Sequence, residues 1–324
     1  MKRNTFRGLS ALAGLAMIAA TSVAADNVKV TPLGGITGEF CRLDRAILFE
    51  DPDGTRILYD AGMTVAGAED PRLGALDALL VTHMHPDHVG SRHTSAVDAG
   101  TCAKPDLSVG AVPATNVVNI AHAKDAKIVT GSEMPALFGA KLASVGGDAK
   151  KSVLARFGAT HMVGGVGVST VPAVHSNGVH HSLIGGNLGE MMKAAGVGGY
   201  VGPPTGYVLR FSNGLVAYLS GDTGMTAEQE KVVRGFYGAD LVVINIGDTF
   251  TTGPAEAAYV VNELVQPKSV IPSHANEEAT KGGVLVEGSR TAKFAAMVTI
   301  PVHIPLSGNT MEFDGEGNCV NGCS

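Results

Sequence analysis

The stretch THMHPDH at residues 82–88 decides the fold and the chemistry expected of this chain. It directly follows Ala78–Val81, an apolar run that predicts a buried strand. His83 and His85 alternate with other side chains, so both can face one side where the strand ends. Pro86 stops the strand, and the aspartate and histidine after it then face a second position. Imidazole and carboxylate at this density suit Zn²⁺ or a similar first-row ion. We interpret the four side chains as donors for two adjacent ions; a polar loop with chance histidines is the alternative.

Short apolar runs of β type alternate with helical stretches along the rest of the chain, which favours α/β layers. The absence of a Pro/Ser-rich linker favours one domain over residues 26–324. Thr252 is expected to cap one helix, with Pro254 in its first turn, and the Gly-rich stretch Gly185–Gly206 is expected to be loop-like. Further strands are expected at Val28–Leu33, Ala46–Phe49, Arg56–Tyr59, Val117–Ile120, Lys127–Val129, Met162–Val174 (a strand pair), Tyr207–Phe211, Leu215–Leu219, Leu241–Ile246 and Val270–Pro272, and helices at Met134–Leu142, Ala227–Phe236, Ala255–Leu264 and Gly288–Met297.

Residues 1–25 have the pattern of a secretory signal peptide. Three basic residues precede an apolar run over Leu9–Ala20, and the small residues around Ala24 and Ala25 fit a cleavage site. An uncleaved anchor is the alternative, but the run is shorter than the about 20 residues that a membrane span needs. We therefore expect a periplasmic or secreted protein with no stable membrane insertion after cleavage.

The composition narrows the choice of partners. The chain has 324 residues, of which 45% are hydrophobic, and a formal net charge of −6, so it holds enough apolar material for a sizeable core. Basic residues do not cluster after the N-terminus, and we expect no nucleic-acid partner because such partners need a basic face. A small-molecule substrate is expected instead, and a homo-oligomer stays open.

Export would permit disulfides between the four cysteines. Cys41, Cys102, Cys319 and Cys323 allow three full pairings, and the sequence does not choose among them. A metal site built on thiolates is the alternative. We favour disulfides because no Cys-x-x-Cys spacing occurs.

The pattern His-x-His-x-Asp-His at a strand end resembles the metallo-β-lactamase fold superfamily. The resemblance covers most of residues 28–313 and implies an αββα sandwich, in which two mixed β-sheets are flanked by helices. It also implies a third histidine, a bridging acid and a last histidine at later strand ends, for which the chain offers His175, Asp222 and His274. The implied ligands of the first metal are His83, His85 and His175, those of the second are Asp87, His88 and His274, and Asp222 bridges the two.

Within that superfamily the chain looks most similar to the ascorbate-6-phosphate-lactonase-like metal-dependent hydrolases. The segments Ser220–Gly224 and Ile246–Pro254 carry this similarity. The chain departs from the branch in its predicted export and in a long insert near residues 176–205.

Four further residues are candidates for orienting the ligands or contacting substrate. The resemblance places Asp60, at the end of the strand Arg56–Tyr59, behind the first metal motif; capping its turn is the alternative. Asp248 resembles a residue near the rim of the site, and stabilising its own turn is an equal alternative. His180 and His181 lie in the insert, where binding substrate or donating a proton competes with the role of an exposed loop histidine.

The resemblance implies an exported dinuclear metal-dependent hydrolase that acts on a lactone or another ester. Two divalent ions, with Zn²⁺ favoured and Mn²⁺ or Fe²⁺ open, would share a hydroxide, because metal binding lowers the pKa of water toward about 7. Asp87 or Asp222 would orient that nucleophile and shuttle its proton. The alternatives are a phosphodiester or phosphotriester hydrolase on the same site, a metal-bound binding protein without turnover, and iron-based redox chemistry.

Overall fold

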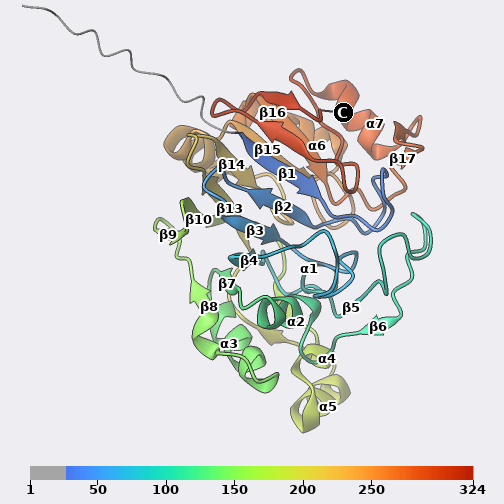
Figure 1. Cartoon of the computed structure of the whole chain (residues 1–324), viewed down its shortest axis with the longest axis vertical. Coiled ribbons are helices and arrows are strands. Elements are labelled where there is room, and N and C mark those ends of the chain that lie inside the picture. Colours follow the sequence, from blue (N-terminus) through green and yellow to red (C-terminus); the bar gives the residue numbers. More distant parts are fainter. Residues whose placement is uncertain (1–26, 324) are drawn as a thin grey trace, which may run out of the picture.

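Two mixed β-sheets lie face to face across the centre of the molecule (Figure 1). The structure, a computed structural model, describes residues 27–323, and the predicted signal peptide lies outside the described residues. Within them, the eight-stranded sheet comprises, in order, β20 (Cys319–Asn321), β19 (Met311–Phe313), β1 (Val28–Pro32), β2 (Ile47–Glu50), β3 (Arg56–Tyr59), β4 (Ala78–Leu80), β7 (Lys127–Thr130) and β8 (Ser152–Leu154). The six-stranded sheet comprises β16 (Ser269–Ser273), β15 (Leu241–Asn245), β14 (Val216–Leu219), β13 (Thr205–Arg210), β10 (Val166–Pro172) and β9 (Thr160–Val163).

Alternating side chains bury both faces of each sheet. In β3, Ile57 and Tyr59 join the core between the sheets, whereas Leu58 packs outward toward helices. In β15, Leu241 packs between the sheets and Val242 packs outward in the same way. The helices are α2 (Asn116–Ala123) and α3 (Met134–Ser144) over the first sheet, and η2 (Gln229–Tyr237), α6 (Pro254–Tyr259), η3 (Val260–Val265) and α7 (Arg290–Met297) over the second. The layers are therefore α, β, β and α, and the expected αββα sandwich is confirmed.

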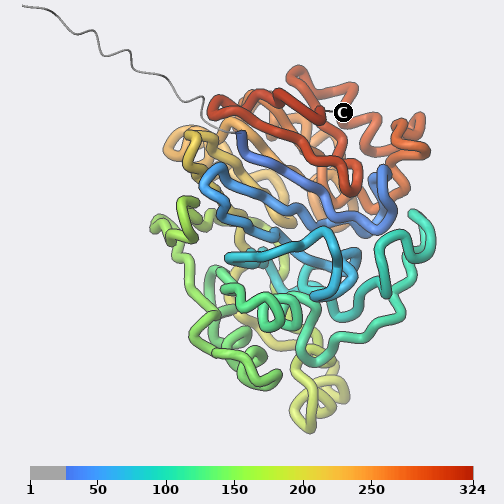
Figure 2. Tube along the Cα trace, in the orientation of Figure 1, coloured from blue at the N-terminus to red at the C-terminus, as the bar shows by residue number. Residues whose placement is uncertain are grey.

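Parallel strands bring their carboxyl ends to one edge of the sandwich. In the first sheet β3, β4 and β7 run parallel, and in the second β14, β15 and β16 do. Segments that follow β4, β14 and β16 therefore meet at this edge, which is where the polar residues of the candidate site lie. The two ends of the described chain meet elsewhere, because β1 pairs with β19 (Figure 2).

Most of the expected strands and helices are present, but one strand prediction is wrong. Val117–Ile120 was expected as a strand and lies in α2 instead. Thr115 caps this helix, since its hydroxyl accepts a hydrogen bond from the Val118 amide. The apolar run is buried along one helical face, a pattern that a four-residue window does not distinguish from a strand.

Two further local expectations are corrected. The stretch Gly185–Gly206 is not loop throughout, because α5 (Gly186–Ala195) occupies much of it between Gly185 and Gly196, both of which have positive φ. Thr252 does not cap the helix that begins at Pro254; Gly253 precedes the helix, and the Thr252 hydroxyl bonds to Asn245 instead.

The remaining elements are α1 (Pro86–Val89), α4 (His181–Ile184), η1 (Ala149–Lys151) and the short pairs β5–β6 (Arg92–His93, Val109–Gly110), β11–β12 (Gly178–Val179, Gly199–Tyr200) and β17–β18 (Thr280–Lys281, Val284–Leu285).

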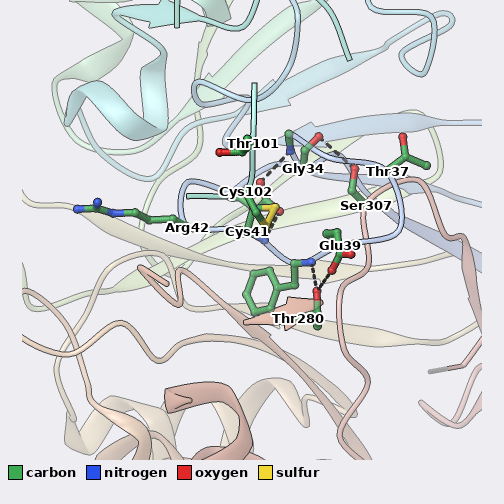
Figure 3. The surroundings of a disulfide bond; sticks show 12 residues. Gly34, Thr37, Glu39, Cys41, Arg42, Thr101, Cys102, Thr280 and Ser307 are labelled. Atoms are coloured by element: carbon green, nitrogen blue, oxygen red, sulfur yellow. Dashed lines mark hydrogen bonds between the residues drawn. A yellow bond between two sulfur atoms is a disulfide. The ribbon is translucent and has the colours of Figure 1, made fainter. Parts of the chain in front are cut away.

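The structure selects one of the three cysteine pairings left open by the sequence. Cys41 bonds to Cys102, and Cys319 bonds to Cys323 (the first of these is drawn in Figure 3). Among residues 27–323, no helix is long and apolar enough to cross a membrane.

Lys141 of α3 ties the insert to the body of the protein. Its side chain is buried, and its ammonium donates to the carbonyl oxygens of Pro113 and of Leu183 in α4. Burial lowers the pKa of Lys141 to about 8.

We predict that Lys141→Met lowers the free energy of unfolding at pH 9 by about 1–3 kcal/mol, because two buried carbonyls lose their donor. At pH 7 the loss should be smaller, because the variant is also spared the cost of burying the charged ammonium. The stability difference between wild type and variant should grow as the pH rises from 8 toward 10, where the unfolded chain holds a proton that the folded chain has released. Urea unfolding at pH 7, 8 and 9 measures both effects. Lys150→Met, on the exposed η1, is the control; a difference that falls as the pH rises would contradict the prediction.

Candidate metal centre

Seven histidine and aspartate side chains converge at the shared edge of the two sheets. They form two groups, and within each group the potential ligand atoms all lie within 4.8 Å of one another. One group is His83, His85, His175 and Asp222; the other is Asp87, His88 and His274. The structure thus brings together all seven residues that the sequence nominated as ligands.

Local geometry at the end of β4 aims the first motif into this edge. His83 and His85 follow the strand, and His85 directly precedes α1, where Pro86 occupies the first turn. Asp87 and His88 then lie on α1 itself, beyond the proline. The Gly62 amide donates to the His88 carbonyl, and a Cβ on Gly62 would lie 2.7 Å from the Asp87 carbonyl, so this close approach requires glycine.

Asp60 and Thr82 orient two of the imidazoles from behind. Asp60 Oδ2 lies 2.8 Å from His88 Nδ1 and accepts from the Thr82 hydroxyl at 2.8 Å. The Thr82 hydroxyl also lies 2.9 Å from His83 Nδ1. Bonds of this kind on Nδ1 leave the Nε2 atoms of both rings facing the site, which is how a carboxylate commonly fixes a metal-binding histidine.

Asp222 lies between the two ligand groups. Its Oδ2 is 3.9 Å from His83 Nε2, 3.7 Å from His175 Nε2 and 3.1 Å from His274 Nε2. Its Oδ1 is 3.4 Å from His88 Nε2. One carboxylate therefore contacts members of both groups, as a ligand shared by two ions would.

The charges around these groups favour ionised carboxylates and mostly neutral imidazoles, the protonation states that bind a metal ion. Burial alone raises the pKa of Asp222, but the neighbouring His88 and His274 outweigh it and hold the pKa well below its ordinary value. The pKa of Asp87 is held well below its ordinary value in the same way, with Arg45 contributing. Burial lowers the pKa of His83, His85 and His175, so these rings are neutral and keep a lone pair. His88 is the exception: burial lowers its pKa, but three carboxylates raise it well above the ordinary value.

The donor set fits a metal ion because several of its buried atoms lack another partner. His83 Nε2, His88 Nε2 and Asp222 Oδ1 are buried and accept or donate no hydrogen bond within the described structure. Buried polar atoms are normally paired. Cations at the two groups would satisfy these atoms, and imidazole with carboxylate suits zinc, manganese and iron.

The other sequence candidates lie in different surroundings. Asp60 is buried against His88, as described above. Asp248 is exposed, and its carboxylate accepts from the Thr249 amide, so it stabilises its own turn. His180 is exposed and caps α4, and its ring is tilted against that of His181, with 3.9 Å between the centroids. Neither histidine belongs to the two ligand groups.

Two contacts to the ligands were not expected from the sequence. Arg45 reaches Asp87 from a loop, and its side chain is 2% exposed. Asn177, in the insert, accepts from the Met84 amide between two ligands and donates to the Gly202 carbonyl. Asn177 could have been found from the sequence, because it follows the ligand His175 by two residues. Arg45 could not, because no motif surrounds it.

The αββα fold and the two ligand groups are those expected of the metallo-β-lactamase superfamily. The family model for the beta-lactamase superfamily domain matches residues 55–275, and the chain belongs to this family. The match spans both ligand groups, from the strand behind the first motif to His274.

Individual relatives agree with this assignment. A UPF0173 metal-dependent hydrolase of Polynucleobacter asymbioticus is 28% identical over 97% of this chain and 99% of that protein. Another, from Koribacter versatilis, is 30% identical over 69% of this chain and 77% of that protein. Among solved structures, a metallo hydrolase from Ignicoccus hospitalis shares the fold with a TM-score of 0.57 at 21% identity, covering 89% of this chain and 99% of that one.

We predict that Asp60→Asn weakens metal binding by about 10–100-fold, because the bond that orients His88 is lost. Asp248→Asn is a matched control: both aspartates have left-handed backbones, with φ of 40° and 59°, but Asp248 contacts no ligand side chain that the structure describes. Competition against a chromophoric chelator gives both affinities. Equal affinities in the two variants would show that Asp60 does not orient the site.

Proposed function

We propose that this metal-dependent hydrolase binds two ions and cleaves a lactone or a related uncharged ester. The observation that carries the proposal is the position of Asp222, which contacts both ligand groups. Two ions bound there would polarise the substrate carbonyl and supply a hydroxide nucleophile at neutral pH. Pairs of ions about 3.5–4 Å apart are common in hydrolytic centres.

The two aspartates nominated as catalytic differ in access to solvent. The Asp222 side chain is 4% exposed and is surrounded by imidazoles, so it suits holding ligands together. The Asp87 side chain is 29% exposed, so water can reach its carboxylate. We therefore assign ligand bridging to Asp222 and orientation of the nucleophile, with transfer of its proton, to Asp87.

The rim beside the ligands supports an uncharged substrate. Val174, Met225 and Phe250 are large, exposed apolar side chains on three segments that carry or adjoin ligands. Hydrogen bonds hold these segments together: the Val174 amide donates to the Thr223 hydroxyl, and the Thr252 amide donates to the Thr223 carbonyl. Phosphate recognition normally uses arginine or lysine. A small pocket behind the ligands is lined by Asp60, His88, Asp222 and His274 among others, and Arg45 is the one arginine or lysine in its lining. The Arg45 guanidinium is already paired with Asp87 and Asn276.

Export completes the proposal. A cleaved signal peptide at residues 1–25 would place the enzyme in the periplasm or outside the cell, where diffusible lactones and esters are available. N-terminal sequencing of the protein recovered from the periplasm tests this part: a chain beginning near Asp26 supports it, and an intact Met1 in the cytoplasm contradicts it.

Elemental analysis of the purified protein, paired with a substrate panel on the same sample, tests the function. We expect two zinc or manganese ions per chain and turnover of lactones or esters in preference to phosphodiesters and β-lactams. His83→Ala should lose turnover together with metal, because His83 belongs to the first ligand group. If that variant hydrolysed the same substrates at the wild-type rate, the assignment to this centre would be wrong. Preferred phosphodiester cleavage would replace the ester proposal.

The apolar rim gives a separate prediction. Phe250→Ala should raise KM for esters with an apolar chain about tenfold while leaving kcat nearly unchanged, since loss of apolar contact removes binding shared by substrate and transition state. Phe236→Ala, an equally exposed phenylalanine near the end of η2, is the control. A series of esters with increasing chain length measures the effect; equal KM values in both variants would remove Phe250 from the substrate site.

A further inference from the structure

A buried arginine holds the most exposed acidic ligand of the centre. Arg45 Nε and Nη2 donate to Asp87 Oδ2 at 3.3 and 3.2 Å. Nη2 also donates to Asn276 Oδ1 at 2.8 Å. Nη1 donates to the carbonyl oxygens of Arg42 and Asp44. All three guanidinium nitrogens are therefore engaged, and the direction of the side chain is set by its own turn as much as by Asp87.

The turn that carries Arg45 is closed internally. The buried Asp44 carboxylate accepts from the Cys41 amide at 2.7 Å and from the Gly35 amide at 2.9 Å. The Asp44 amide donates back to the Cys41 carbonyl. A Cβ on Gly34 would lie 2.2 Å from Asp44 Oδ2, so the backbone packs directly against this carboxylate. The turn over residues 41–45 is thus a compact unit with Cys41 at one end and Arg45 at the other.

A disulfide and a threonine fix this unit from two sides. Cys41 bonds to Cys102, 61 residues further along the chain, and Figure 3 shows Cys102 beside Thr101 on one side of the turn. On the other side, the Phe40 amide donates to the Thr280 hydroxyl at 2.8 Å. The Cys41 side chain is almost fully buried and Cys102 is partly buried, so the disulfide joins the start of the turn to the loop that carries Cys102.

We propose that Arg45 is a positioning residue for Asp87, and that the Cys41–Cys102 disulfide sets the position of Arg45. Arg45 fixes one oxygen of Asp87 and keeps the carboxylate at the His88–His274 side of the centre, where His274 Nε2 lies 3.4 Å from the same oxygen. The disulfide then controls how tightly the Asp87–His88–His274 group binds its ion. This inference rests on the proposed two-ion function.

The test is a titration of metal-free protein with Co²⁺, read by the visible absorption of the bound ion and by competition with a chelator. Wild type should bind two ions. Arg45→Met should bind the ion at the Asp87–His88–His274 group with about 10–100-fold lower affinity. Its affinity for the ion at the other group should equal that of the wild type. Arg45→Lys, which keeps the charge without the planar fork, should restore part of the affinity. Arg56→Met is the matched control, because Arg56 also forms an ion pair, with Glu50, and lies at the start of β3, the opposite end of that strand from the ligand groups.

The disulfide has its own matched control. The double variant Cys41→Ser and Cys102→Ser should lose affinity for the same ion several-fold, whereas Cys319→Ser with Cys323→Ser should bind both ions as wild type does. The outcomes separate the proposed two-ion function from the positioning role of Arg45 and the disulfide. A wild type that binds a single ion would overturn the dinuclear function. A wild type that binds two ions, with unchanged affinities in folded Arg45→Met, Arg45→Lys and the Cys41/Cys102 variant, would overturn the positioning role alone.

Discussion

The structure depends on a buried carboxylate, Asp222, surrounded by imidazoles from both sheets. His83 and His88 come from the end of the first sheet, whereas His175, His274 and Asp222 itself come from the second. These groups meet only if the two sheets stack with their strand ends level. The apolar core between the sheets supplies that alignment. The buried, unpartnered ring nitrogens are a cost of the arrangement that bound cations would offset.

The ligands could be predicted because they depend on strand ends, and strand ends are visible in the sequence. A buried apolar run followed by histidine or aspartate marks His83, His175, Asp222 and His274 alike. The layered fold followed from the same runs. Val117–Ile120 was misassigned because four apolar residues suit either element, and the capping Thr115 carried the deciding information. Arg45 could not be predicted, since only the folded chain brings its turn, Asp87 and Asn276 together.

The two sheets make different contributions to the centre. The first sheet supplies the orienting bonds, in which Asp60 and Thr82 hold the imidazoles of His83 and His88. The second supplies Asp222 and the segments that carry the exposed apolar rim. Ligand geometry thus rests mainly on buried strand ends, whereas the surface offered to a substrate rests on loops. This separation lets the loops change what they bind while the ligand geometry stays fixed.

Asn177 shows how the insert is attached. Its side-chain amide accepts a hydrogen bond from the Met84 amide and donates one to the Gly202 carbonyl. The base of the insert is thus bound to the ligand loop through main-chain atoms. The tip, α5, projects from the body at the lower edge of the view in Figure 1. Variation is therefore confined to the tip, because Val179 and Leu183 at the base of the insert are buried in the core. The tip can change in length and composition over evolution, or be exchanged by an engineer, while the base keeps its bonds to the ligand loop.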